Sequence, residues 1–348
     1  MIEALGAIAP GRPLRDGLDR VLQANMGALI VVGDGPDVLS ICSGGLLLDA
    51  EFSPQRLAEL AKMDGAIILA ADASRIARAN VHLVPSPGVF TSETGTRHRT
   101  AERVARSIDV PVIAVSEDLS VITLYRGEDK HALDSVARLL GRANQALQTL
   151  ERYRDRLDSV TTSLSAAEVE DLVTARDVVT VLQRAEMVRR IAEEIEGYIV
   201  ELGTDGRLAH LQLDELMAGV EDERRHVGRD YTPTDDPDSV DEAMLALAFL
   251  PTDRVLDPAA VMTVLDLDDG GDLDSSLQPR GYRLLGRIPR LPEALVDAVV
   301  RRYGTLQKVM RATAEDLESV PDVDPATART IKDGLARLAE TSILDRYS

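Results

Sequence analysis

Short apolar runs alternate with amphipathic stretches over the first 130 residues of the chain. The apolar runs are five to seven residues long, as buried strands are, and they cover residues 27–33, 66–70, 110–115 and 121–125. Between the first two runs, Ser53 and Pro54 stand directly before an amphipathic stretch, which is typical of a helix N-cap followed by proline at the first helical position. This alternation predicts an α/β domain with a mixed or parallel central sheet.

The pattern changes to helical spacing from about residue 131. Apolar residues recur between charged ones over 135–157, and Ser165 to Glu168 match a capping box that predicts the start of a second helix reaching residue 196. A third helix is predicted over 210–227. Long, strongly charged helices of this kind are typical of an all-α spine that separates other domains or mediates oligomerisation.

Two acidic stretches, 231–238 and 266–272, predict turns or linkers. The second superficially resembles a calcium loop. It lacks the terminal glutamate at the required spacing, so we interpret it as a linker.

The last 63 residues contain an internal repeat. The segments 288–292 and 320–324 lie 32 residues apart, and each is a tight turn with apolar residues at both ends between two helical stretches. Repeated turns of this kind are typical of tandem helix-hairpin-helix units. The sequence thus predicts a multidomain protein with an α/β domain (1–135), an all-α helical spine (136–285) and a small all-α helix-hairpin-helix domain (286–348).

Charge is concentrated in the middle of the chain. The net charge is −20, and residues 131–285 carry 16 basic against 32 acidic residues. This acidic middle repels nucleic acid, so any DNA contact requires a local basic patch.

Cys42 is the only cysteine, which excludes an intrachain disulfide and favours a reducing compartment; we expect it to be a small core residue. No apolar run approaches the roughly 18–20 residues of a membrane span, and the N-terminal residues lack the pattern of a signal peptide. We therefore expect a cytoplasmic protein that does not contact the membrane.

Asp64 and Gly65 stand just before the second apolar run. A carboxylate at the start of a central strand projects from the edge of the sheet, where it can bind Mg²⁺ or Mn²⁺ or assist removal of a hydroxyl proton. The plainer alternative is that Asp64 only caps a turn.

A turn rich in hydrogen-bond donors follows at residues 95–100. Gly95 allows close backbone approach, and the helix predicted from Ala101 adds anion affinity at its N-terminus. Arginine side chains favour bidentate phosphate contact. The five consecutive donor residues, which predict a phosphate site, are Thr96, Arg97, His98, Arg99 and Thr100.

Other polar segments are weaker signals. Glu117 and Asp118 follow the third apolar run and either add carboxylates to the same edge or cap a turn. The Ser43-Gly44-Gly45 segment is interpreted as a hairpin turn.

The pair KMDGAIIL and GTRHRTAER, at this separation and in this strand context, resembles the diadenylate cyclase domain. With the helical middle and the tandem hairpins, the whole chain resembles the DNA integrity scanning diadenylate cyclases. The resemblance implies that two ATP molecules become cyclic di-AMP and two pyrophosphates where two subunits face each other. It also implies an octamer in which the spine separates catalytic domains from DNA-binding tails.

The resemblance assigns roles to individual residues. Asp64 binds the metal and helps to activate the ribose 3′-hydroxyl, and Gly65 approaches the nucleotide through its backbone. Leu83 packs near the nucleotide. The triphosphate is held by Thr96, Arg97, His98, Arg99 and Thr100.

The tail departs from the family pattern. Glycines normally expose backbone N–H groups to DNA in the second hairpin, but Asp322 and Asp324 stand at those positions and Pro325 follows. A residual basic patch would consist of Arg290, Lys308, Arg329 and Lys332. We therefore predict weaker binding of branched DNA, or binding through another surface.

Two other functions remain open from the sequence. One is a catalytically inactive nucleotide-binding scaffold on DNA, against which the intact Asp64 and Arg97–Arg99 argue. The other is a nucleotidyltransferase that acts on a separate acceptor.

Overall fold

The computed structural model of the chain describes residues 1–117, 119–267 and 272–346. It divides into two compact units, one formed by Met1–Gln145 with Glu194–Leu211 and the other by Ala146–Glu193 with Gln212–Ser348. Within these described ranges, no helix combines the length and the apolar character needed to cross a membrane.

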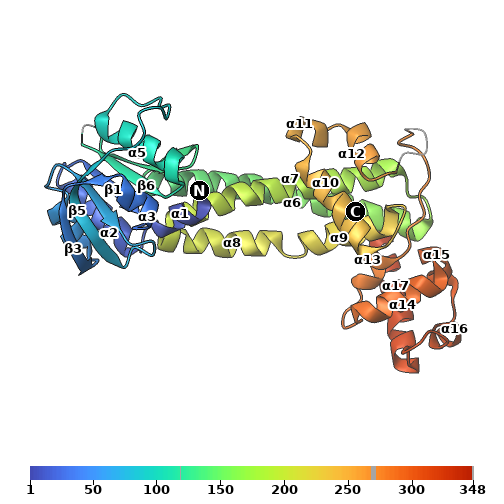
Figure 1. Cartoon of the computed structure of the whole chain (residues 1–348). Helices are drawn as coiled ribbons and strands as arrows, with labels where there is room; N and C mark the ends of the chain where they lie inside the picture. The colour runs from blue at the N-terminus through green and yellow to red at the C-terminus, as the bar shows by residue number, and fades with distance from the viewer. Residues whose placement is uncertain (118, 268–271, 347–348) are drawn as a thin grey trace. The chain divides into compact units, whose positions relative to one another are not determined.

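A mixed sheet forms the centre of the first unit, as predicted (Figure 1). Its strand order is β2-β5-β4-β1-β6-β7-β8, and β3 also pairs with β5. Strands β1 and β4 run parallel, whereas β1 and β6 are antiparallel. The strands are β1 (Ala28–Val32), β2 (Cys42–Ser43), β3 (Leu46–Glu51), β4 (Ala66–Leu69), β5 (Arg75–Leu83), β6 (Val112–Ser116), β7 (Val121–Arg126) and β8 (Asp129–Ala132).

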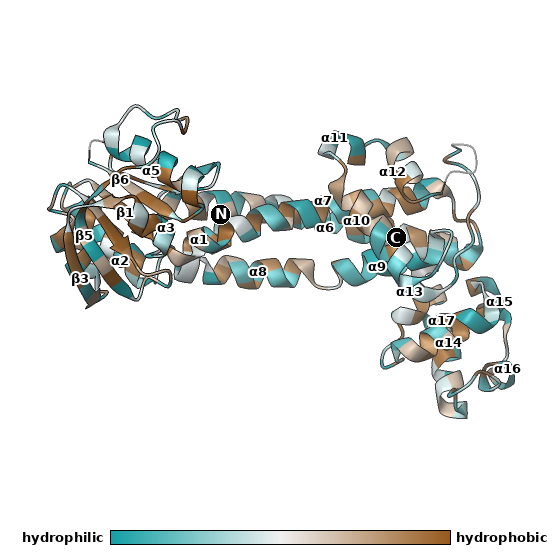
Figure 2. Cartoon of the chain, viewed as in Figure 1, coloured by the Kyte–Doolittle hydropathy of each residue, from teal (hydrophilic) through white to brown (hydrophobic). Residues whose placement is uncertain are grey.

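Helices cover both faces of this sheet. One core contains side chains of α2 (Pro13–Gln23) and α4 (Pro54–Leu60), and the other contains side chains of α5 (Thr96–Ile108). Along β1, Ile30 belongs to the first core, while Leu29 and Val31 belong to the second. Burial on both faces explains why the strands are continuous apolar runs, coloured brown in Figure 2.

The shorter helices of this unit are α1 (Ile2–Ala7) and α3 (Pro36–Ser40). The predicted cap of α4 is confirmed, because the Ser53 hydroxyl accepts a hydrogen bond from the Arg56 N–H at 3.2 Å. Cys42 is half-buried, and burial raises the pKa of its thiol.

Gly44 and Gly45 interrupt one strand rather than forming the predicted hairpin turn. The pairing with β5 keeps its register across the two glycines, with Ser43 opposite His82 and Leu46 opposite Ala79, and shifts only later, between Leu47 and Ala50. Both glycines have positive φ, 64° and 83°, which an extended strand does not accommodate.

The prediction of a helix start at Ser165 is wrong. Helix α6 runs without a break from Val136 to Glu170. Within it, the buried Ser165 hydroxyl donates to the Thr161 carbonyl at 3.0 Å and accepts from Arg283 at 2.8 Å. The capping-box residues therefore serve tertiary contacts inside the helix.

The next helix, α7, begins at Ala175 and ends at Leu202. Its start is marked by Thr174, whose N–H and hydroxyl both donate to the Asp177 carboxylate at 2.9 and 2.7 Å. Helix formation therefore resumes at a Thr-x-x-Asp sequence, nine residues after the position predicted for it.

The helix predicted over 210–227 is two helices. Helix α8 covers Arg207–Met217 and α9 covers Val220–Tyr231, separated at Gly219, which has a φ of 74°. The remaining helical elements before the tail are η1 (Gly203–Gly206), α10 (Pro237–Phe249), α11 (Thr252–Val255) and α12 (Pro258–Val264). The acidic stretch 231–238 ends by capping α10 through Asp236, whereas most of the calcium-like stretch falls on residues 268–271, outside the described residues.

The repeat in the tail corresponds to two helix-turn-helix units with a shared core. Arg290 and Asp322, 32 residues apart, occupy equivalent positions in the two turns with φ values of 65° and 63°. The helices are α13 (Tyr282–Gly286), α14 (Glu293–Tyr303), α15 (Leu306–Arg311), α16 (Ala314–Glu318) and α17 (Pro325–Arg346).

Candidate nucleotide site

Both sequence motifs lie at one edge of the sheet. Because β1 and β4 are parallel, Gly27 before β1 and Asp64 before β4 share the edge formed by the amino ends of these strands. The donor-rich segment is the first turn of α5. This helix begins at Thr96, with Gly95 as N-cap, and not after Thr100 as the sequence suggested.

The structure brings the two motifs into contact. The Arg97 Nη2 and Asp64 Oδ1 atoms are 3.5 Å apart, and the Asp64 side chain is 99% exposed. An ion pair this open to water contributes little stability. Little free energy is therefore lost when the ion pair opens, so Asp64 and Arg97 are each available to bind a ligand.

Gly27 makes room for the Arg97 guanidinium, a contact that the sequence did not indicate. A Cβ atom at Gly27 would stand 2.4 Å from Nη1 and 2.8 Å from Cζ of Arg97. The guanidinium thus lies directly over a backbone position that only glycine leaves open. A glycine ending the turn before β1 is the one sequence signal of this contact.

A glycine at position 65 is needed for packing within the sheet. A Cβ atom there would stand 2.6 and 2.7 Å from the backbone of Asn80, which has a φ of 52° where β5 departs from regular pairing with β4. Close packing of two strands therefore requires glycine before β4.

Leu83 is a core residue at the end of β5. It is 6% exposed and belongs to the core under α5. The expected contact of Leu83 with the nucleotide stays a prediction.

His98 is held by a chain of polar side chains. Its Nδ1 lies 2.8 Å from the Tyr125 hydroxyl, which donates to Glu93 Oε1 at 2.9 Å, and Lys130 donates to the same oxygen. Burial lowers the pKa of His98, and the Lys130 and Arg97 charges act in the same direction, opposed by Glu93. His98 is therefore neutral near pH 7.

Two more residues of the motif use part of their capacity within the protein. Arg99 donates to the Thr94 carbonyl at 3.1 Å, and the Thr100 hydroxyl donates to the Thr96 carbonyl at 2.9 Å. The first-turn N–H groups of α5 donate to no N-cap side chain, since Gly95 has none. The helix N-terminus thus presents backbone donors beside Arg97 and Arg99.

The loop before α5 is anchored to that helix. The buried Glu102 carboxylate accepts from the Thr91 hydroxyl and from the Ser92 N–H at 3.0 Å. Arg103 donates to the Val89 carbonyl at 3.0 Å, and Arg106 to that of Phe90 at 3.1 Å. These contacts fix the loop that carries Glu93.

Further carboxylates do not complete a metal site. Glu117 is exposed after β6, and Asp118 lies outside the described residues. Within the described part of the chain, no group of three or more His, Cys, Asp or Glu side chains is arranged to hold a metal ion.

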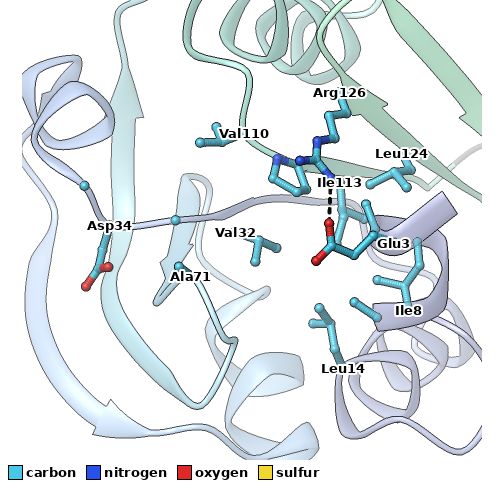
Figure 3. Close-up of a pocket in the computed structure, with 15 residues that line it drawn as sticks. Glu3, Ile8, Leu14, Val32, Asp34, Ala71, Val110, Ile113, Leu124 and Arg126 are labelled. Carbon is cyan, nitrogen blue, oxygen red and sulfur yellow. Dashed lines mark ion pairs between the residues drawn. The ribbon is translucent and has the colours of Figure 1, made fainter. Parts of the chain in front are cut away.

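A cavity of about 420 Å³ lies at the opposite end of β1 (Figure 3). Residues 32–35, which end and follow β1, line it, as does Ala71 after β4. Glu3 and Arg126 form an ion pair of 3.6 Å at this cavity. It is therefore separate from the Asp64 edge.

The tail residues predicted to bind DNA differ in their surroundings. Arg290, Lys308 and Arg329 are exposed. Lys332 is half-buried and donates to the Met310 carbonyl at 2.8 Å. Lys332 thus has a structural contact that competes with a role toward DNA.

The fold and this site define a class of protein, an α/β nucleotide-binding domain followed by a helical linker. Residues 15–130 match the family model described as DisA bacterial checkpoint controller nucleotide-binding, and residues 133–273 match the DisA bacterial checkpoint controller linker region.

Relatives match along nearly the whole chain. The DNA integrity scanning protein DisA of Frankia casuarinae is 55% identical over 346 residues, which cover 99% of this chain and 96% of that protein. The proteins of the same name from Acidothermus cellulolyticus and Streptomyces coelicolor are 54% and 52% identical, covering 99% and 100% of this chain and 94% of each relative. The chain belongs to the DNA integrity scanning protein DisA family.

Proposed function

We propose that this protein is a diadenylate cyclase that condenses two ATP molecules into cyclic di-AMP and two pyrophosphates. The observation that carries the proposal is the 3.5 Å approach of Asp64 to Arg97 at the N-terminus of α5. Asp64, which can assist removal of the hydroxyl proton, and Arg97, which can bind phosphate, stand together at the edge formed by the amino ends of β1 and β4. Membership of the family supports the same activity.

In the proposed reaction, the ribose 3′-oxygen of one ATP attacks the α-phosphorus of a second ATP. The hydroxyl proton leaves and the bond to the first pyrophosphate breaks. The 3′-oxygen of the second nucleotide then attacks the α-phosphorus of the first in the same way, which releases the second pyrophosphate and closes the ring. Asp64 helps to activate the hydroxyl, while Thr96, Arg97, His98, Arg99 and Thr100 hold the triphosphate. The backbone donors of α5 add to this hold.

The exposure of the site supports a shared arrangement. Asp64 is 99% exposed, so the described chain by itself does not enclose the reacting atoms. A second subunit facing the first would exclude water and supply the other ATP. We propose that such pairs assemble further into an octamer in the cytoplasm, which light scattering would test as a mass eight times the 37.7 kDa chain.

The residues present fit a divalent cation bound together with the nucleotide. Asp64 supplies one carboxylate, and Mg²⁺ commonly takes its remaining ligands from substrate phosphates and water. When bound, Mg²⁺ or Mn²⁺ would neutralise charge on the phosphates.

Incubation with ATP and Mg²⁺ or Mn²⁺, with products separated by chromatography, tests the proposal. We expect cyclic di-AMP from the wild-type protein and a loss of roughly 100-fold or more in rate for Asp64→Asn. Asp37→Asn, another exposed carboxylate of the same domain, should keep the wild-type rate. Bound ATP without any product would indicate the inactive scaffold, and transfer only to an added acceptor would indicate an ordinary nucleotidyltransferase.

We propose that the tail binds branched DNA weakly. Asp322 places a carboxylate at the left-handed position of the second turn, and Asp324 caps α17 by accepting from the Thr327 N–H at 2.7 Å. Two carboxylates at this turn repel phosphate. A mobility-shift titration that found tight, salt-sensitive binding lost on neutralising Arg329 and Lys332 would contradict this.

A further inference from the structure

The side chains behind His98 form one continuous series of hydrogen bonds. Lys130 of β8 and Tyr125 of β7 both donate to the same oxygen of Glu93, and Tyr125 also contacts His98 Nδ1. Tyr125 is 1% exposed. Tyr125 therefore links the core to the first turn of α5, while Lys130 at the other end of the series is exposed.

The number of protons in this series settles which atom donates at each contact. Burial raises the pKa of Glu93, but hydrogen bonds from Lys130 and Tyr125 outweigh it and the net shift is downward, so the carboxylate is ionised. Burial and Glu93 raise the pKa of Tyr125, so the phenol keeps its one proton. An ionised carboxylate has no hydrogen to give, and the Tyr125 proton must therefore point to Glu93.

The consequence falls on His98. With its only hydrogen directed at Glu93, the Tyr125 oxygen can only accept from His98 Nδ1, so the ring hydrogen is on Nδ1. We infer that Lys130, Glu93 and Tyr125 are positioning residues that hold His98 as the Nδ1–H tautomer, leaving a lone pair on Nε2 until an anionic ligand binds.

This tautomer changes the role of His98 in the phosphate site. A lone pair on Nε2 repels a phosphate oxygen, whereas a protonated ring attracts it. Given the proposed triphosphate site at α5, binding of ATP takes up a proton from solvent at Nε2. The charged and titratable groups facing His98 are Arg97 on α5, Glu93 in the preceding loop, Tyr125 on β7 and Lys130 on β8.

The positioning chain also accounts for the anchored loop. Glu93 can orient Tyr125 only if the loop before α5 stays in place, and Glu102 holds that loop through Thr91 and Ser92. In addition, the Glu93 N–H donates to the Thr91 hydroxyl at 3.1 Å. The position of the His98 ring therefore depends on residues from four separate segments of the domain.

Solid-state ¹⁵N NMR of histidine-labelled protein reads the tautomer directly, with His98 assigned from the difference spectrum of His98→Gln. We expect a protonated Nδ1 and an unprotonated Nε2 in the nucleotide-free protein. Tyr125→Phe removes the acceptor, so the signal should shift toward the Nε2–H form, while the matched Tyr303→Phe should not change it. A wild-type Nε2–H signal, or an unchanged signal in Tyr125→Phe, would overturn the inference whether or not the protein is a cyclase.

Calorimetry in two buffers of different ionisation enthalpy tests the proton uptake. We expect uptake of up to about one proton per ATP bound near neutral pH, and none in His98→Gln. Tyr125→Phe should alter the pH at which uptake occurs, an effect that loss of packing alone would not produce. ATP binding without proton uptake would refute the role of His98, whereas absence of ATP binding would instead refute the proposed function.

Discussion

Two glycines at the candidate site act through different physical constraints. Gly27 leaves room for the flexible end of the Arg97 side chain, while Gly65 leaves room for the backbone of Asn80. A side chain can move aside and a strand backbone cannot. Substitutions at these two positions should therefore separate function from stability.

Gly27→Ala should weaken ATP binding without unfolding the domain. The new methyl group would meet Nη1 of Arg97 at 2.4 Å and displace the guanidinium from Asp64. We expect a rise of about tenfold in the Kd for ATP, equivalent to about 1.4 kcal/mol. The thermal midpoint should fall only slightly, because the Val115 carbonyl, 3.3 Å from the new methyl group, has to shift a little. Gly35→Ala is the matched control because a Cβ there meets nothing within 4 Å. Equal affinity in both variants would contradict the role given to Gly27.

Gly65→Ala should destabilise the domain itself. The methyl group would approach Cα and the carbonyl carbon of Asn80 to 2.7 and 2.6 Å, so two strands of the sheet must separate. We expect a loss of about 1–3 kcal/mol in the free energy of unfolding, typical of overpacking. Urea denaturation followed by circular dichroism measures it. A wild-type midpoint would show that β5 yields more easily than its pairing suggests.

At the scale of elements, the sequence predicted what depends on local pattern and missed what depends on distant partners. Strands buried on both faces are continuous apolar runs, so β1, β4, β6 and β7 could be read directly. The Ser165 to Glu168 segment has the composition of a helix start, but its polar groups bind residues more than 50 positions away. Likewise, both halves of the motif pair were visible, whereas Gly27 and the Tyr125 chain act on α5 from separate segments of the sequence.

The buried ion pair of Glu168 and Arg283 should be strongly coupled. Both side chains are 0% exposed and 2.6 Å apart, linking α6 to α13 within the second unit. We expect Arg283→Met alone to cost about 3–5 kcal/mol, because it leaves Glu168 buried without its main partner. The double variant Glu168→Gln/Arg283→Met should recover much of this loss in urea unfolding. Additive losses would show that the two residues act independently.

The start of α13 should make this region sensitive to pH. Asp230 is 1% exposed and accepts the N–H groups of Gly281, Tyr282 and Arg283. Burial and the nearby Glu168 charge raise the pKa of Asp230 from 3.8 to about 7, although the three N–H groups oppose the shift.

A carboxyl with a raised folded-state pKa contributes stability at low pH, and this contribution is lost as pH rises through the folded value. For Asp230 the loss falls between about pH 4 and 7 and amounts to about 4 kcal/mol at most. Hydrogen exchange of the α13 amides should therefore be slower at pH 5 than at pH 7 after correction for intrinsic rates. An α13 protected equally at both values would contradict the shift.

At the scale of the whole molecule, the two ends of the chain differ in how well they retain the chemistry that their family implies. The edge with Asp64 and Arg97 keeps a carboxylate beside a cation, both open to a ligand. The second turn of the tail keeps the left-handed backbone of a glycine turn while carrying an aspartate there. The fold of the tail is thus maintained by α17 and its cap, while the turn presents carboxylates where the proposed DNA contact would lie.

Replacing Asp322 tests whether charge or backbone access limits DNA binding. Asp322→Asn removes the charge and still tolerates a φ of 63°, while Asp322→Gly also exposes the backbone N–H groups. If repulsion dominates, both variants should bind branched DNA roughly three- to tenfold more tightly, equivalent to about 1 kcal/mol near a surface phosphate. If access dominates, only the glycine variant should gain. Both gains should shrink as salt is raised, because phosphate contacts are screened and release counterions. Unchanged affinity in both variants would show that this turn does not approach DNA, and would direct attention to the exposed Arg290 and Lys308.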